Sequence, residues 1–408
     1  MPRCKAHLAD AQKRGVRMSD IIALNDWIAT VDDVFPHINK PTVKLLALWS
    51  FSIATLKSCS LSSVSQFVAS LLGASINTAR QRLRELYLEK ENKRGEKRRT
   101  IDPEQCFLPL LKWIMNRWDN SPVAIAIDAT NLKDRFVVLT VSVSYCSIAI
   151  PIAWKVLRTN QSGSWNSHWI RLLKTIQPAF SKDHIVLVLA DRGIYSPSLF
   201  RTIASMGFHP YLRINSGGMF KPEGKKIWIP LSNLIKSPGE QWSGRVTLFK
   251  STKSRLECTL LGCWQHDGEK PWLIATDLMP GESDPLWYGF RAWIEQMFKN
   301  LKREGWQWHR TRIESADRAE RHLLAIALAF ILVISITPNV EHLPDIEFHI
   351  ETTKKKHSSI FSPHSISAFR AGRILLLMCL IAGKSLPKPR FITIPWDLFT
   401  MARYGCSE

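Results

Sequence analysis

The chain has 408 residues, of which 45% are hydrophobic and 22% charged, so its composition excludes an intrinsically disordered protein and allows two or more folded domains. It holds 55 lysines and arginines against 35 acidic residues, a formal net charge of +20. Such an excess favours a polyanionic partner, either nucleic acid or an acidic lipid surface. A basic protein without such a partner is the plainer alternative.

The eight cysteines are spread from Cys4 to Cys406 without a dense framework, which is typical of a reducing compartment. The tightest group is Cys258, Cys263 and His266. It lacks a second ligand pair at the spacing of a structural zinc site, so we expect no zinc there.

Neither the N-terminal residues nor the most apolar run predicts a segment that enters a membrane. The first residues, MPRCKAHLADAQKRG, carry charges but no apolar core, so we expect no signal peptide. The longest apolar run, residues 323–336, has 14 residues and follows the charged DRAERH. It is too short to span a bilayer comfortably and predicts a buried core helix.

Residues 20–120 show apolar residues at three- and four-residue spacing, which predicts helices. Within them, SVSQFVASLLGASINTARQRLRELY resembles a helix-turn-helix with its turn at Gly73 and Ser75 as the cap of the second helix. The second helix carries side chains that suit base edges and phosphates: Asn77, Arg80, Gln81 and Arg84. Helix pairs of this kind also occur as plain packing units.

From residue 121 the texture changes to runs rich in β-branched residues, VAIAID, RFVVLTVSVSY and IVLVLAD, with the helical HWIRLLKTIQPAF between them. Short strands and turns fill residues 208–280, and helical patterns follow to about residue 337. The sequence therefore predicts an α/β core in two parts, 121–207 and 281–337. A β-rich insertion at 208–280 separates them, a helical DNA-binding domain at 1–120 precedes them, and a helical, basic tail at 338–408 follows.

Two aspartates end or interrupt strongly apolar strands. Asp128 follows VAIAI, and Asp191 follows IVLVLA. A carboxylate at the end of a buried strand costs several kcal/mol unless it is compensated, and such strand ends are where α/β sheets present functional groups. Each could also be an ordinary turn residue.

The run WYGFRAWIEQMFKNLK, residues 287–302, predicts a helix with one unusual face. At roughly 100° per residue, Tyr288, Arg291, Glu295 and Lys302 fall within an arc of about 60°, and Lys299 lies beside it. A surface ion pair between Glu295 and Lys299 is the simpler interpretation of the acid alone. Taken with Asp128 and Asp191, however, Glu295 completes a set of three separated carboxylates that could bind a pair of divalent metal ions.

These residues together resemble the DDE transposases of bacterial insertion sequences. LVLADRGIYS around Asp191 matches the second acid in its Asp-Arg-Gly turn, and Asp128 with Thr130 matches the first. The Tyr-x2-Arg-x3-Glu-x6-Lys signature of the IS-four-like group is met by residues 288–302. The resemblance covers about residues 120–335.

The resemblance implies a ribonuclease-H-like catalytic core with a β-rich insertion between the second and third acids. It implies that Asp128, Asp191 and Glu295 are catalytic and hold two Mg²⁺ ions, for which Mn²⁺ substitutes. It also implies that Tyr288, Arg291 and Lys302 bind DNA phosphates. We expect Lys299 to join them because it lies beside them on the helical wheel, although the family pattern does not require it. The partners would be double-stranded DNA, as terminal inverted repeats and as target, and a second copy of the chain on the paired ends.

The same resemblance implies a cytoplasmic, nucleoid-associated protein with no membrane partner. In some members a tryptophan of the insertion holds a flipped base, and four occur here: Trp228, Trp242, Trp264 and Trp272. Two alternatives stay open: a catalytically inactive or domesticated DNA-binding protein, and a ribonuclease-H-like nuclease that does not transfer strands.

Overall fold

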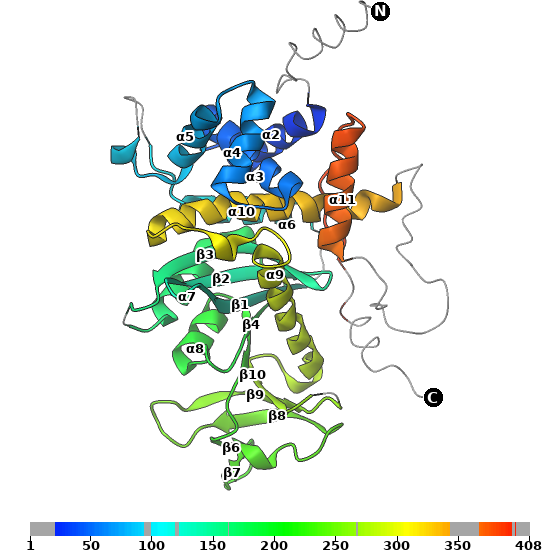
Figure 1. The fold of residues 1–408 in the computed structure, drawn as a ribbon. Coiled ribbons are helices and arrows are strands. Elements are labelled where there is room, and N and C mark those ends of the chain that lie inside the picture. The colour runs from blue at the N-terminus through cyan, green and yellow to red at the C-terminus, as the bar shows by residue number, and fades with distance from the viewer. Residues whose placement is uncertain are drawn as a thin grey trace, which may run out of the picture.

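The computed structural model describes residues 21–93, 99–118, 122–161, 163–266, 268–342, 367–393 and 396. In Figure 1 the N-terminal helices lie above the long helix α10, the sheet lies below α10, and the strands β6–β9 form the far end of the molecule. The helices are α2 (Ile22–Val34), α3 (Lys40–Leu56), α4 (Leu61–Leu72), α5 (Ile76–Tyr87), α6 (Glu104–Met115), α7 (Asn166–Ile176), α8 (Pro197–Ser205), α9 (Trp293–Leu301), α10 (Ala316–Ile336) and α11 (Ala368–Ile381).

The N-terminal region is helical, as the periodicity predicts. The predicted helix-turn-helix is formed by α4 and α5, with Gly73 in the left-handed conformation at φ 58°. The hydroxyl of Ser75 accepts a hydrogen bond from the Thr78 N–H and so caps α5. The apolar side of α5 is buried and consists of Ala79, Leu83 and Leu86. The polar face of α5 stays available for other partners.

One mixed sheet runs through the described part of the molecule, in the order β3-β2-β1-β4-β5-β10-β9-β8-β6-β7. β1 is antiparallel to β2 and parallel to β4, and β4 is parallel to β5. The strands are β1 (Val123–Leu132), β2 (Phe136–Tyr145), β3 (Ile148–Arg158), β4 (Val186–Ala190), β5 (His209–Arg213), β6 (Met219–Pro222), β7 (Ile229–Pro230), β8 (Gln241–Leu248), β9 (Leu256–Cys263) and β10 (Trp272–Thr276).

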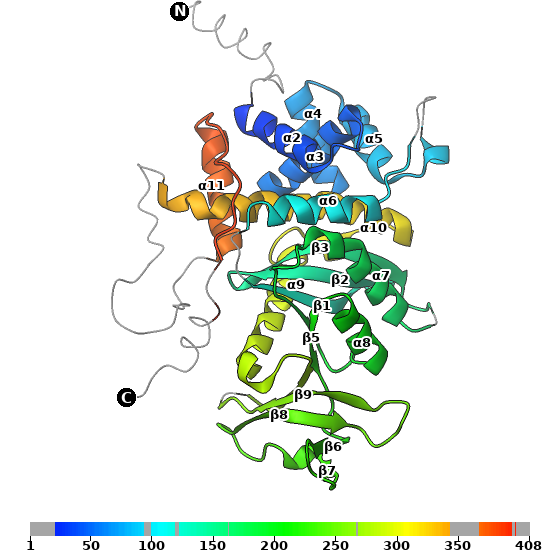
Figure 2. The ribbon, with the colours of Figure 1, turned by 180° about the vertical axis from the view of Figure 1, so that it is seen from behind.

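The central strands of the sheet, such as β2 and β4, are buried on both faces and therefore have continuous apolar runs. On β4, Leu187 and Leu189 join a cluster that also contains Tyr288, whereas Val186 and Val188 belong to the main core. This is the two-residue alternation of a strand covered on both sides. Figures 1 and 2 place α9 on one side of the sheet and α7 with α8 on the other.

The sequence expectation for the β-rich insertion needs one correction. Residues 208–280 do contain short strands, but β5, at the start of this range, pairs in parallel with β4 and extends the core sheet. β10, at its end, pairs with both β5 and β9. The strands of the insertion therefore continue the sheet of the core. If the insertion folded as a separate sheet, the hydrogen-bonding edges of β5 and β10 would be left unpaired.

The apolar run 323–336 forms part of α10, which packs between the N-terminal helices and the sheet. By length and composition this helix could cross a membrane, but 83% of its most apolar window is buried inside the protein. α11 packs on it at Gly372, where a Cβ atom would lie 2.0 Å from the Val333 oxygen. The apolar side chains of α10 are therefore explained by its contacts with neighbouring helices and strands.

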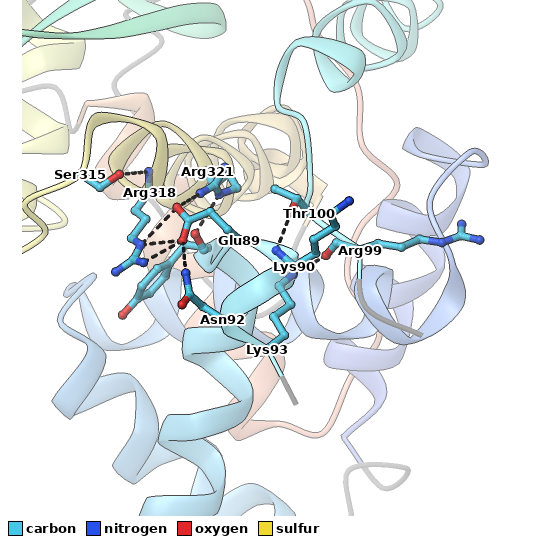
Figure 3. A network of polar contacts seen from close by, with 10 residues as sticks. Glu89, Lys90, Asn92, Lys93, Arg99, Thr100, Ser315, Arg318 and Arg321 are labelled. Carbon is cyan, nitrogen blue, oxygen red and sulfur yellow. Dashed lines mark hydrogen bonds and ion pairs between the residues drawn. The ribbon is translucent and has the colours of Figure 1, made fainter. Parts of the chain in front are cut away.

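A polar network joins the end of α5 to the start of α10 (Figure 3). The Glu89 carboxylate accepts hydrogen bonds from Arg318 Nη2 and Arg321 Nη2, each at 2.7 Å. Arg321 also donates to the Tyr87 carbonyl at 2.8 Å. The hydrogen bond from Arg318 is the largest cause that lowers the pKa of Glu89 to about 2. One carboxylate thus fixes the N-terminal helices to the core.

Candidate active site

The parallel pairing of β1 and β4 brings the two predicted aspartates together. Ile127 pairs with Ala190, so Asp128 and Asp191 follow paired residues on adjacent strands, about 5 Å apart along the sheet. The Asp128 carboxylate accepts a hydrogen bond from the Ala129 N–H, and the Asp191 carboxylate accepts one from the Arg192 N–H, each at 2.8 Å. Each carboxylate is thereby oriented by the backbone of the residue that follows it.

The segment that carries the signature is not the single α-helix that the sequence predicts. Residues Pro285–Ala292 form a 3₁₀-helix, η6, which Asp284 caps, and α9 begins only at Trp293. In a 3₁₀-helix, side chains three residues apart are eclipsed, which places Tyr288 and Arg291 on one side. The prediction of one continuous helix was therefore wrong, although these two side chains do share a face.

Arg291 joins two of the three acids. Its Nη2 donates to Asp128 Oδ2 at 2.7 Å, and its Nη1 donates to Glu295 Oε1 at 2.6 Å. The side chains of Arg291 and Asp128 are 16% and 18% exposed, whereas that of Glu295 is 55% exposed. The guanidinium thus lies between a half-buried strand acid and a more open helix acid.

The third acid belongs to the same electrostatic environment. Burial raises the pKa of Asp128; Arg291 opposes this shift, and Asp191 and Glu295 both add to it. Asp191 also accepts a long hydrogen bond, 3.5 Å, from the Tyr288 hydroxyl, whose pKa burial raises. The structure therefore places all three predicted acids around Arg291 and Tyr288.

Arg213 is a site residue that the sequence did not predict. It ends β5, and its Nη1 lies 3.8 Å from Asp191 Oδ1. The sequence signal was weak, because only the parallel pairing of β5 with β4 carries this arginine to the acids, and the sequence pattern placed β5 in the insertion.

Lys302 reaches the site from beyond the end of α9. Its Nζ donates to Thr130 Oγ1 at 2.5 Å and to the Asn131 carbonyl at 2.7 Å, so it ties the helix end to β1. Burial lowers the pKa of Lys302, and neighbouring Arg303 adds to this. Lys299 is exposed in the last turn of α9.

Arg80 and Arg84 lie elsewhere. Both are on α5 and border a separate cavity between the N-terminal helices and the segment that follows α9. The structure does not bring them to the three acids.

The donor set of the three acids is compatible with a hard divalent cation, because it consists of carboxylate oxygens without sulfur or imidazole. Within the described ranges, however, no group of three or more His, Cys, Asp or Glu side chains is arranged to hold a metal ion. In the structure the Arg291 guanidinium lies between Asp128 and Glu295 and supplies positive charge to both.

A pocket of about 650 Å³ adjoins the acids on the side of the insertion. Tyr288, Arg291 and Arg213 border it, and so do Trp264 and Trp272, two of the four insertion tryptophans. The Trp272 ring packs edge-on against Tyr288, with centroids 5.1 Å apart. Trp242 instead packs on Phe220, within the insertion.

Comparison with known proteins gives one family match. Residues 149–332, from β3 into α10, match the family model described as the transposase DDE domain. No curated protein sequence matches the chain. Among solved structures, a piggyBac transposase synaptic complex with hairpin DNA aligns at 11% identity and a TM-score of 0.35, covering 81% of this chain and 80% of that chain.

Proposed function

We propose that this protein is a DDE transposase that cleaves DNA at the ends of its own element and joins them to target DNA. The observation that carries the proposal is the convergence of Asp128, Asp191 and Glu295 around Arg291. Three acids, one within β1, one directly after β4 and one on α9, are unlike a structural ion pair, which needs only one carboxylate for each cation. The match to the transposase DDE domain supports this assignment.

The core would be ribonuclease-H-like. The strand order supports this proposal, because the antiparallel strands β3, β2 and β1 are followed in the sheet by the parallel strands β4 and β5. Asp128 and Asp191 directly follow the last paired residues of β1 and β4. The IS-four-like assignment rests on the spacing of Tyr288, Arg291, Glu295 and Lys302 alone.

Asp128, Asp191 and Glu295 would hold two Mg²⁺ ions, or Mn²⁺ in their place. When bound, such ions supply an activated water and stabilise the leaving oxygen of a phosphodiester. The protein's own residues would orient the DNA: Arg291 and Lys302 are cations beside the acids, and the Tyr288 hydroxyl fixes Asp191.

The partners follow from this chemistry. The DNA would be double-stranded, as the terminal inverted repeats of the element and as the target, and a second copy of the chain would pair the two ends. The positive net charge of +20 supports a polyanionic partner of this kind. We place the protein in the bacterial cytoplasm, at the nucleoid.

A nicking assay tests the catalytic assignment. Duplex DNA carrying the ends of the element is incubated with Mg²⁺ and wild type, Glu295→Gln or Glu304→Gln. Glu304 is an exposed acid just past α9 and serves as the matched control. We expect nicking by wild type and Glu304→Gln, and a loss of at least about 100-fold in Glu295→Gln. Equal cleavage by all three proteins would remove Glu295 from the reaction.

A second assay separates the alternatives. Pre-cut ends with a free 3′-hydroxyl are mixed with plasmid, and joined products are counted. A transposase yields joined molecules, a nuclease without strand transfer yields cut but unjoined DNA, and an inactive DNA-binding protein yields neither.

A further inference from the structure

A large cavity lies away from the three acids, between the N-terminal helices and the core. Its volume is about 1100 Å³. The start of α4 and one face of α5 form one wall. Residues 307–315, which follow α9 in the chain, and the first turns of α10 form the other.

This cavity has an unusual density of one charge. Six arginines border it and only one carboxylate, that of Glu314: the arginines are Arg80, Arg84, Arg158, Arg310, Arg312 and Arg318. Arg318 is paired with Glu89, as Figure 3 shows. In the part of the chain that the structure describes, Arg158 and Arg312 have no carboxylate within ion-pair distance. Both side chains are exposed. A concave surface lined by cations of one sign concentrates its potential on an anion.

The protein backbone adds to this potential. The residues that begin α4, Leu61, Ser62 and Ser63, border the cavity, and the N-cap Ser60 makes no side-chain capping bond. The first N–H groups of a helix are unsatisfied within the helix and carry partial positive charge, so they bind anions well.

Buried donors in the wall also lack partners. Trp49 is fully buried, and its Nε1 makes no hydrogen bond in the described structure. The Nε of Arg80 is likewise buried and without an acceptor. Buried donors of this kind are normally satisfied, so acceptors that enter the cavity would complete the wall.

From these observations we infer that the cavity is a phosphate-binding cleft that grips the backbone of duplex DNA between the N-terminal helices and the catalytic core. The inference rests on the proposed function for its choice of DNA. Arginines stand on both walls, so the cleft suits several phosphates rather than one, and guanidinium groups pair with phosphate oxygens in a two-pronged geometry. Arg80 and Arg84 would then contact the DNA backbone, not the bases. Free polyphosphate has the same chemistry and is the other source of such groups.

The test is DNA binding by the full chain, measured by fluorescence anisotropy in EDTA at several salt concentrations between roughly 50 and 200 mM. The variants are Arg312→Gln and Arg158→Gln, both on exposed side chains so that folding is preserved. The control is Arg171→Gln, an equal loss of charge on α7, where Arg171 pairs with Glu104 outside the cleft.

We expect each cleft variant to weaken binding by roughly tenfold on duplexes of any sequence. It should also reduce the slope of log affinity against log salt by about 0.9 for each phosphate that the variant no longer neutralises. Arg171→Gln should bind as wild type does. Unchanged affinity and slope in both cleft variants would overturn the inference.

A parallel arm adds tripolyphosphate to the wild type and to Arg312→Gln and follows the melting temperature. If tripolyphosphate stabilises only the wild type while DNA affinity is the same in both, the cleft serves free polyphosphate and the DNA assignment is overturned. Because EDTA removes divalent ions, failure of the metal-dependent nicking assay leaves this result unaffected, and the two hypotheses fail separately.

Discussion

Arg291 is the residue on which the geometry of the candidate site depends. Its guanidinium donates to Asp128 and Glu295, which lie 167 residues apart in the chain, at 2.7 and 2.6 Å. Burial disfavours the ionised form of Asp128, and Arg291 is the first influence that opposes it. Arg291 therefore supplies positive charge to two carboxylates that the chain brings together from β1 and α9.

Replacing Arg291 by Gln should therefore destabilise the metal-free protein by about 2–4 kcal/mol, because a half-buried carboxylate is left without its countercharge. Mg²⁺ should recover part of this loss, since it supplies the missing positive charge. The measurement is the urea midpoint of unfolding with and without Mg²⁺. Arg171→Gln, at an exposed ion pair, should cost under about 1 kcal/mol and show no Mg²⁺ effect. An Arg291→Gln variant whose midpoint ignores Mg²⁺ would argue against metal binding by these acids.

Two lysines of the signature region should behave differently. Lys302 makes two hydrogen bonds to β1, whereas Lys299 is exposed. We expect Lys302→Met to lower the free energy of unfolding by about 1–2 kcal/mol and Lys299→Met to change it by less than about 0.5 kcal/mol. Thermal unfolding of both variants checks this. Equal effects would mean that the bonds of Lys302 to Thr130 and Asn131 contribute nothing.

At the residue scale, the sequence predicted three acids that the structure brings together, but it did not predict their contacts. Asp128 and Asp191 were predictable because a carboxylate at the end of an apolar run is conspicuous. Arg213 was not, because its place depends on which strand pairs with β4, and arginine at a strand end is common. The pairing of Arg291 with Glu295 also displaced the simpler expectation of a bridge between Glu295 and Lys299.

Among the elements, η6 shows where helix periodicity misleads. The pattern of residues 287–302 fits an α-helix, but Pro285–Ala292 winds as a 3₁₀-helix, and its rings of Tyr288 and Phe290 pack against the sheet. Tertiary packing therefore decides between a 3₁₀-helix and an α-helix here, and the helix propensities of the individual residues do not reveal it. Helices α3, α4, α5 and α10 were predictable, since each buries a strong apolar stripe. β3 was overlooked, although its pairing with β2 is extensive.

The contact of α5 with α10 gives an element-scale prediction. Glu89→Gln removes the carboxylate shared by Arg318 and Arg321, and should lower the free energy of unfolding by about 1–3 kcal/mol at neutral pH. Glu91→Gln is the control, because Glu91 is exposed and has only a distant pairing with Lys90. Urea unfolding at pH 7 compares the two.

The pH dependence of this effect has a definite sign. The pKa of Glu89 is lowered from 4.5 to about 2 in the folded protein, so its contribution is complete above about pH 4.5 and is lost as the pH falls toward 2. The difference between wild type and Glu89→Gln should therefore shrink over that window. A difference that stays constant from pH 7 to pH 3 would show that the carboxylate's charge is not what stabilises the junction.

For the whole molecule, two separate places hold cations that could meet a polyanion: the candidate active site, where Arg291 and Lys302 lie beside the acids, and the arginine-lined cleft. The net charge of +20 predicts a polyanion but not its path across the surface. On the proposed function, the arrangement of the N-terminal helices on α10 would set that path. This arrangement arises from packing across more than 200 residues of chain and includes the ion pairs of Glu89. Long-range assembly of this kind leaves no local signal in the sequence.

The central claim is that Asp128, Asp191 and Glu295 share divalent metal ions. The most direct measurement is anomalous diffraction from crystals soaked in Mn²⁺, for wild type and for Asp191→Asn. The claim predicts strong anomalous peaks in the wild type with these three carboxylates as protein ligands, and reduced peaks in the variant. Mn²⁺ bound elsewhere, or no peak among the three acids at saturating Mn²⁺, would contradict it.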